Sequence, residues 1–334
     1  MRRSSWLRRA IIAIVVIVIG LPSLVLACFR FAAARRETVS RTAAAPRTGR
    51  FVRAADVEMY VQETGPHDGA PVLLIHGTGA WSEIWRRTLD TLAALGYHGV
   101  AIDMPPFGYS DRPANADYGD EAQARRILGV IAALGLDRVT LVGHSFGARP
   151  TMEAFFLDGS RIARLVLVDA ALGLDTTARR PGWPVRAALA APPVRNALVS
   201  ATLTNPAFTA RLLRGLVADA SAVTGPRIAM FQQPFVRERA TASYGEWLRS
   251  FVTMSERSLA TDRERYRAIR VPALVVWGEA DNITPLSQGK EIAGLIPGSV
   301  WVGLAGVGHI PAIEATDRFN AELAGWLGRV PPGR

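Results

Sequence analysis

The chain has 334 residues, of which 49% are hydrophobic and 20% charged, enough apolar material to bury a full core. This composition excludes a disordered tail and a mini-protein, and no fixed-period repeat indicates a solenoid or propeller. The single cysteine, Cys28, cannot form an internal disulfide. Five scattered histidines without cysteine partners match no structural zinc pattern, so a zinc finger is excluded as well.

The net charge of +10 is unevenly distributed along the chain. Residues 1–50 contain ten arginines and one acidic residue, a net charge of +9, whereas residues 51–334 contain 29 basic and 28 acidic residues. A nucleic-acid-binding domain carries its own basic surface, and the larger part of this chain is nearly neutral. Nucleic acid is therefore not expected as a partner.

The first feature along the chain is an uncharged apolar segment, Ala10–Phe29. Its twenty residues would reach about 30 Å as a helix, the thickness of a bilayer core. Arginines flank the segment on both sides, so the charge rule for membrane orientation is almost balanced. A basic start followed by an apolar segment is typical of an export signal, and we predict a single-pass anchor over residues 1–30 with an extracytoplasmic catalytic part.

Two other fates of the N-terminus are considered. Val25–Cys28 resembles a bacterial lipobox, in which cleavage before Cys28 would leave a lipidated cysteine as the anchor. Ala32–Ala34 would instead serve as a signal-peptide cleavage site and release a secreted protein. Residues 31–50, rich in Ala, Arg, Thr and Ser, are predicted to be a linker.

After Arg50 the pattern changes to short β-branched runs that alternate with helical stretches, which is typical of a mostly parallel sheet covered by helices on both faces. The expected strands are Phe51–Ala55, Val57–Thr64, Val72–His76, Val100–Asp103, Val139–Gly143, Leu165–Asp169, Ala273–Trp277 and Val300–Leu304. The expected helices are Ser82–Leu95, Asp120–Leu134, Phe146–Leu157, Leu286–Leu295 and Ala315–Leu327.

Residues 174–267 break this alternation, because they contain no clear buried strand and many prolines that limit helix length. We interpret them as an insertion. Its aromatic residues are expected to line a pocket, to contact a membrane or to pack a small core of the insertion itself. They include Trp183, Phe208, Phe231, Phe235, Tyr244, Trp247 and Phe251.

The insertion is also basic, with 14 basic and 7 acidic residues, whereas the rest of residues 51–334 has 15 basic and 21 acidic residues. We hypothesise that the insertion faces anionic lipid head groups or an anionic substrate. The alternative is an arginine-rich solvated face.

The strongest motif is Gly143-His144-Ser145-Phe146-Gly147, which lies between a predicted strand and a predicted helix. A nucleophile at such a turn needs a strained backbone, and the flanking glycines remove side chains that would clash. The position predicts Ser145 as a nucleophile. The alternative is an ordinary glycine-rich turn.

A serine hydroxyl needs a base, usually His, and an acid that orients the base, usually Asp. In one known arrangement the three residues follow each other along the chain in the order Ser, Asp, His. Asp281 lies just after the predicted strand Ala273–Trp277, and His309 lies in a glycine-rich loop after Val300–Leu304. We expect His309 to accept the Ser145 proton and Asp281 to fix the imidazole tautomer. The alternatives for the acid are Asp169 and Glu279, and structural roles are expected for His67, His76, His98 and His144.

The oxyanion formed by attack needs two preorganised donors. One is predicted to be the backbone N–H of Phe146, the residue after the nucleophile. The other is assigned to Thr78 in the loop His76–Gly79, with Gly79 as the second choice and a plain glycine turn as the alternative.

Together these motifs resemble the α/β-hydrolase fold family over residues 51–329. The segment Asp103–Ser110 is similar to the family's D-x-P-G-x-G-x-S loop, with Pro106 where glycine is usual. The resemblance implies an eight-stranded, mostly parallel sheet flanked by helices, with a mainly helical cap inserted after strand six. Residues 51–173 and 268–330 would form the core, and residues 174–267 would form the cap.

Serine at position 145 disfavours haloalkane dehalogenases and epoxide hydrolases, members of the family that use aspartate. The resemblance then implies a carboxylic-ester hydrolase, esterase-like or lipase-like, that acts on a small-molecule or lipid ester through an acyl-enzyme. The alternatives are a C–C bond hydrolase, a cofactor-free haloperoxidase-like enzyme, or a non-catalytic accessory protein at the membrane. No cofactor and no metal are expected, and the oligomeric state is not predicted.

Overall fold

The computed structural model describes residues 8–9, 13, 16–174, 181–252 and 258–330. Its centre is one sheet in the order β1-β2-β4-β3-β5-β6-β7-β8. The strands are β1 (Gly49–Ala54), β2 (Val57–Thr64), β3 (Pro71–Ile75), β4 (His98–Ile102), β5 (Val139–His144), β6 (Ile162–Val168), β7 (Ala273–Gly278) and β8 (Val300–Leu304). β2 is antiparallel to β1 and β4, and the other neighbouring strands are parallel. The predicted eight-stranded, mostly parallel sheet is confirmed.

Both faces of the sheet are buried, because alternate residues of each strand point to opposite sides. On β3, Leu73 and Ile75 join one apolar cluster, whereas Val72 and Leu74 join another. The first cluster is covered by α5 (Asp120–Ala133), α6 (Ala148–Leu157) and α13 (Leu286–Leu295). The second is covered by α4 (Arg86–Ala94) and α15 (Thr316–Arg329). The five helices predicted between the strands thus have counterparts, which differ from the expected bounds only near their ends.

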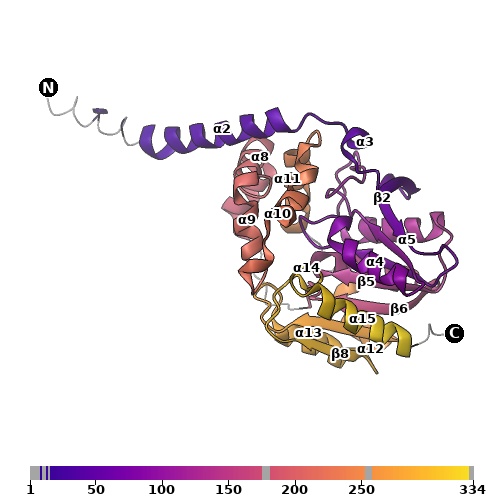
Figure 1. Cartoon of the computed structure of the whole chain (residues 1–334). Helices are drawn as coiled ribbons and strands as arrows, with labels where there is room; N and C mark the ends of the chain where they lie inside the picture. Colours follow the sequence, from indigo (N-terminus) through magenta and orange to yellow (C-terminus); the bar gives the residue numbers. More distant parts are fainter. Residues whose placement is uncertain (1–7, 10–12, 14–15, 175–180, 253–257, 331–334) are drawn as a thin grey trace.

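The stretch between β6 and β7 is helical in its described residues and adds no strand to the sheet. Its main helices, called the cap helices below, are α7 (Trp183–Ala190), α8 (Pro192–Ala201), α9 (Pro206–Arg214), α10 (Gly225–Gln232) and α11 (Ala240–Val252). The first four of these carry proline in their first turn, where the missing N–H costs no hydrogen bond. Figure 1 shows α8 to α11 grouped together beside the sheet. A short helix, α12 (Arg263–Arg267), leads back to β7.

The N-terminal helix α2 (Leu21–Arg36) is attached to the cap helices and runs beyond the boundary that we expected at residue 30. Figure 1 shows one end of it next to α8 and the other end extending away from the rest of the chain. Ala33 is buried, and Arg36 Nη2 donates a 2.7 Å hydrogen bond to the carbonyl oxygen of Thr204. The next residue, Glu37, accepts a hydrogen bond from the Thr241 hydroxyl.

The segment after α2, predicted to be a linker over residues 31–50, makes defined contacts instead. The Val39 N–H donates to Val236 at 3.0 Å, and the Glu238 N–H donates to the Val39 carbonyl oxygen at 2.9 Å. Arg41, at the start of α3 (Arg41–Ala44), then pairs with Glu58 of β2 at 2.6 Å. These contacts hold the segment against both the cap helices and the sheet.

Among the described residues, one helical stretch, Val16–Arg36, is long and apolar enough to cross a membrane. It overlaps the predicted span Ala10–Phe29, part of which lies outside the described residues. Very little of it is buried against the rest of the protein, and Leu21, Leu24 and Phe31 are largely exposed. The helix therefore has an apolar surface that the described part of the chain leaves uncovered.

We expect deletion of residues 1–47 to destabilise the protein by roughly 4 kcal/mol, because the four hydrogen bonds described above, each worth about 1 kcal/mol, are lost. Deletion of residues 1–30 is the matched control, since it keeps Ala33, Arg36, Glu37 and Val39. Unfolding of both variants by heat and by urea measures the difference. Equal stability of the two deletions would show that the contacts of residues 31–47 contribute nothing.

Candidate active site

Ser145 lies directly after β5 in a strained turn, with a φ of 52° that L-residues rarely adopt. A 3-10 turn, Ser145–Gly147, follows and leads into α6. A Cβ at position 147 would lie 2.3 Å from the carbonyl oxygen of His76, so the turn has room only for glycine there. The strained turn that the motif predicted is present, and it holds the Ser145 side chain beyond the end of the strand.

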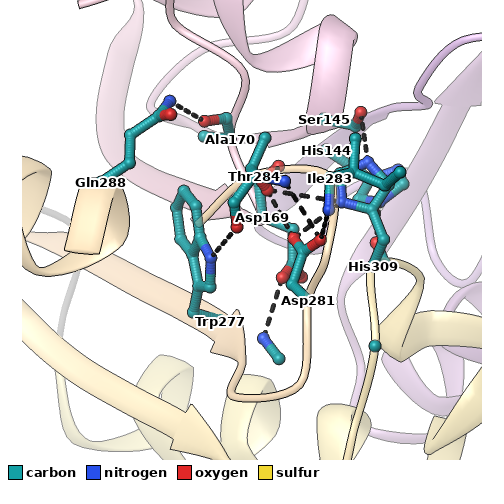
Figure 2. A network of polar contacts seen from close by, with 12 residues as sticks. His144, Ser145, Asp169, Ala170, Trp277, Asp281, Ile283, Thr284, Gln288 and His309 are labelled. Atoms are coloured by element: carbon teal, nitrogen blue, oxygen red, sulfur yellow. Dashed lines mark hydrogen bonds and ion pairs between the residues drawn. The ribbon is translucent and has the colours of Figure 1, made fainter. Parts of the chain in front are cut away.

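The structure brings together the three side chains predicted to act in sequence (Figure 2). The Ser145 Oγ lies 2.7 Å from His309 Nε2, and His309 Nδ1 lies 2.8 Å from Asp281 Oδ2. Ser145 is buried just after β5, and His309 is buried in the loop that follows β8. This geometry allows a proton to pass from the serine hydroxyl to the imidazole while the carboxylate orients the ring.

Asp281 is held by several donors in the loop after β7. Its Oδ1 accepts the Ile283 N–H at 2.7 Å, and its Oδ2 accepts the Thr284 hydroxyl at 2.5 Å in addition to His309. Burial alone would raise its pKa, but the hydrogen bond and charge of His309, with the other donors, lower the pKa of Asp281 to about 2. The carboxylate is therefore ionised at neutral pH.

Asp169, the alternative acid, lies close to this site but has a different role. Its Oδ1 accepts the Gly278 N–H at 2.8 Å, and its Oδ2 has no hydrogen-bond partner among the described residues. Burial, reinforced by the neighbouring Asp281, raises the pKa of Asp169 well above its usual value. Asp169 is therefore a weaker acid than Asp281, and His309 donates its Nδ1 hydrogen bond to Asp281 rather than to Asp169 or Glu279.

The two motif histidines, His76 and His144, are structural links. His144 Nε2 donates to the carbonyl oxygen of His309 at 2.8 Å and so fixes the backbone of the base. His76 Nδ1 donates to the Gly77 carbonyl oxygen at 2.7 Å, and its Nε2 accepts the Met104 N–H at 2.9 Å. Burial lowers the pKa of His144 to about 3 and that of His76 to about 4, so both rings are neutral.

The loop expected to supply the second oxyanion donor passes directly beside the nucleophile. A Cβ at Gly77 would lie 2.9 Å from Ser145 Cβ, which shows how closely the two backbones approach. Thr78 and its alternative, Gly79, line the same cavity as Ser145 and His309. Phe146 follows the nucleophile, and its ring is buried. The predicted oxyanion residues are therefore gathered at one place, next to the Ser145 hydroxyl.

Sequence reasoning missed Glu314, which fixes the loop that carries His309. This residue of α14 (Pro311–Glu314) accepts N–H groups from Gly308 at 2.7 Å, Ala218 at 2.8 Å and Asp219 at 2.6 Å. The His309 N–H also donates to the carbonyl oxygen of Leu216 at 2.7 Å. The position of the base thus depends on the segment that follows α9. No local pattern around Glu314 indicated this role.

A cavity of about 390 Å³ opens at Ser145, between the sheet and the cap helices. Five of the seven aromatic residues named in the sequence analysis line it, whereas Trp183 and Phe208 are partly or largely exposed elsewhere. Among the described residues, the lining contains no Asp, Glu, Lys or Arg. The residues that enclose the apolar part of the cavity are Leu203, Leu212, Leu213, Leu216, Phe231, Phe235, Tyr244, Trp247, Leu248, Phe251 and Ile283.

The sheet order and the strained serine turn at the end of its fifth strand define a hydrolase-fold protein. Residues 70–316, well over half of the chain, match the family described as alpha/beta hydrolase fold, and the chain belongs to that family.

Its relatives include proteins named as hydrolases. The chain is 29% identical to a 2-hydroxymuconate semialdehyde hydrolase of Pseudomonas sp. (strain CF600), over 84% of this chain and 94% of that protein. It is 26% identical to a 2-hydroxy-6-oxononadienedioate/2-hydroxy-6-oxononatrienedioate hydrolase of Paraburkholderia phymatum, over 88% of this chain and 99% of that protein.

A solved structure of a membrane phospholipase A, a bacterial virulence factor, is similar in fold, with a TM-score of 0.67 and 22% identity. The match covers 98% of this chain and 99% of that chain, so it extends into the N-terminal helix. At this identity the likeness is one of fold alone.

We expect Asp281→Asn to remove a pH-dependent part of the stability. A carboxylate whose pKa falls to about 2 in the folded state stabilises the fold above its ordinary value near pH 4. This stabilisation, roughly 2 kcal/mol, is lost as the pH falls from about 4 to about 2. Urea unfolding of both proteins at several pH values should therefore show a stability difference that shrinks over this range. A difference independent of pH would contradict the assignment.

Proposed function

We propose that the protein is a serine hydrolase that cleaves a neutral, lipophilic carboxylic ester through an acyl-enzyme. The observation that carries this proposal is the cavity at Ser145, whose described lining is apolar and free of charged side chains. Lipophilic acyl chains gain from such burial, at roughly 25 cal/mol per Å² of apolar surface.

In the proposed mechanism, His309 Nε2 takes the hydroxyl proton as Ser145 Oγ attacks the ester carbonyl carbon. The backbone N–H groups of Phe146 and Thr78 are the proposed donors to the resulting oxyanion. Collapse of the tetrahedral intermediate breaks the C–O bond, and the alcohol leaves with the proton from His309. Water then attacks the acyl-enzyme with His309 again as base, releases the acid and restores the serine.

The described lining of the cavity has no charged side chain, which favours a neutral substrate over an anionic one. A dienedioate, the compound in the name of one relative, carries two carboxylates. Burying an unpaired carboxylate costs several kcal/mol, and an arginine or lysine in the cavity would be needed to offset this cost. The described lining residues include neither. This argument favours a neutral substrate, and it disfavours the anionic substrate that the basic insertion suggested.

C–C bond hydrolysis is the second candidate, and the relatives favour it. The same three side chains would serve, with Ser145 attacking a ketone carbonyl. The bond that breaks would then release a carbanion stabilised as an enolate, and His309 would supply its proton. The substrate would be a diketone whose remaining chain suits the apolar cavity.

We expect the protein to hydrolyse p-nitrophenyl esters, with kcat/KM rising as the acyl chain lengthens into the apolar cavity. Each added methylene that is fully buried should raise kcat/KM by up to about fourfold, from roughly 0.8 kcal/mol per CH₂. A vinylogous diketone assayed in parallel tests the second candidate. Turnover of the diketone alone would overturn the ester assignment in favour of C–C hydrolysis.

Ser145→Ala is the control for that assay, and it should lose at least about three orders of magnitude in activity while keeping its fold. A fluorophosphonate probe should label the wild type and not the variant, because phosphonylation with loss of fluoride needs the activated hydroxyl. No labelling of the wild type, or equal labelling of both, would support the non-catalytic accessory alternative instead.

We also propose that α2 is an uncleaved membrane anchor with the catalytic part outside the cytoplasm. Its length, its uncovered apolar surface and its contacts with the cap helices support this location. Cleavage after Ala34 would remove the buried Ala33, which argues against the secreted form. Lipidation at Cys28 is compatible with the docked residues, since that side chain is exposed. The basic excess of the insertion would favour anionic head groups nearby.

The full chain should stay in the membrane fraction after carbonate extraction, and deletion of residues 1–30 should release it in active form. Cys28→Ala separates the two anchored forms by mass, because a lipoprotein is shortened by cleavage before Cys28 and the variant is not, whereas a helical anchor keeps its full length in both. Retention of the deletion variant in the membrane would show that other surfaces hold the protein there.

A further inference from the structure

A second cavity, of about 490 Å³, lies at the edge of the sheet opposite Ser145. His98 is the first residue of β4, and Glu63 is near the end of β2, which runs in the opposite direction. His67 lies in the turn between β2 and β3. The three side chains line this cavity together, although they belong to separate elements.

The carboxylate and imidazole atoms of Glu63, His67 and His98 lie close enough together to bind one metal ion. Glu63 Oε1 lies 3.3 Å from His98 Nε2, and one ligand atom from each of the three residues lies within 4.8 Å of the others. Two ligands about 2.0 Å from a tetrahedral zinc ion are about 3.3 Å apart. The Glu63 and His98 atoms already have this separation, and a rotation of the exposed His67 side chain would bring in the third.

His98 is the independent observation that points to a ligand. Its side chain is 4% exposed, and neither ring nitrogen makes a hydrogen bond of normal geometry with a described residue. A buried polar group without a partner is destabilising. A cation bound to Nε2 would satisfy one of these nitrogens.

A neighbouring arginine orients the Glu63 carboxylate. Arg50 donates to Oε2 at 2.8 Å, which leaves Oε1 directed toward His98. A partner that orients a ligating carboxylate in this way is a common feature of metal sites.

We propose that Glu63, His67 and His98 form a binding site for a divalent transition-metal cation of the zinc type. Two imidazoles and one carboxylate favour zinc-like ions over calcium or magnesium, which prefer oxygen ligands. Asp68 lines the same cavity. The site would tie the turn after β2 to the start of β4.

Because this site lies across the sheet from Ser145, the bound ion would stabilise the fold without taking part in hydrolysis. A ligand that binds only the folded state raises the unfolding temperature as its concentration increases. The inference is thus independent of the proposed ester hydrolysis, and its experiment does not rely on activity.

The test uses the full chain in detergent, without a histidine tag, titrated with Co²⁺ and then with Zn²⁺. We expect the visible absorption of tetrahedrally coordinated Co²⁺ to appear with about one ion per chain and to disappear as Zn²⁺ displaces it. Zn²⁺ should also raise the unfolding temperature. Calorimetric titration with Zn²⁺ gives the stoichiometry and affinity.

His67→Ala should weaken binding by roughly tenfold or more, and Glu63→Gln should do the same. His67 is exposed, so its variant is expected to fold, and Glu63→Gln conserves side-chain volume. Asp137→Asn is the matched control, because this exposed carboxylate lines the same cavity outside the cluster and should leave binding unchanged.

Three outcomes would overturn the proposal. One is the absence of a tetrahedral Co²⁺ spectrum, which would leave Glu63 and His98 as a plain ion pair. The second is unchanged Zn²⁺ affinity in His67→Ala. The third is Zn²⁺ binding that survives His67→Ala and blocks fluorophosphonate labelling, which would place the ion at Asp281 and His309 instead.

Discussion

The arrangement of the active site depends on the parallel pairing of β5, β6, β7 and β8. Parallel neighbours end at the same edge of a sheet, so the loops that follow them meet there. Ser145, Asp281 and His309 each follow one of these strands, and the register that pairs Gly278 with Leu304 fixes how far their loops extend. Sheet hydrogen bonding thus brings residues from distant parts of the chain into contact.

Burial and the supply of hydrogen-bond donors shift the pKa values of the polar groups around His309 in different directions. Asp281 is surrounded by donors and stays ionised, whereas burial raises the pKa of Asp169, which lies close by and has fewer donors. His144 is neutral and so acts as a fixed donor to the backbone of His309. A cationic His144 would compete with His309 for the Asp281 carboxylate, and the neutral ring avoids that competition.

The sheet and the site were predictable because both are encoded locally. Buried strands appear as short β-branched runs, and polar residues directly after them, such as Ser145 and Asp281, are expected at the functional edge. The docking of Arg36 and Val39 was not predictable, since it depends on tertiary contacts that leave no periodic pattern. The same holds for Glu314, and for which aromatic rings of the insertion face the cavity. The cluster at His98 was missed because its members are separate in sequence and follow no ligand spacing.

The opposite edge of the sheet gathers polar residues for a related reason. β2 alone runs against its neighbours, so Glu63 near its end lies beside His98 at the start of β4. β4 has five residues, and at about 3.3 Å each it separates the two edges by roughly 16 Å. That distance is on the order of two Debye lengths at physiological salt, so a charge at one edge has little effect on the other through solvent. One sheet can therefore hold a charge-sensitive active site and a cation site that act independently.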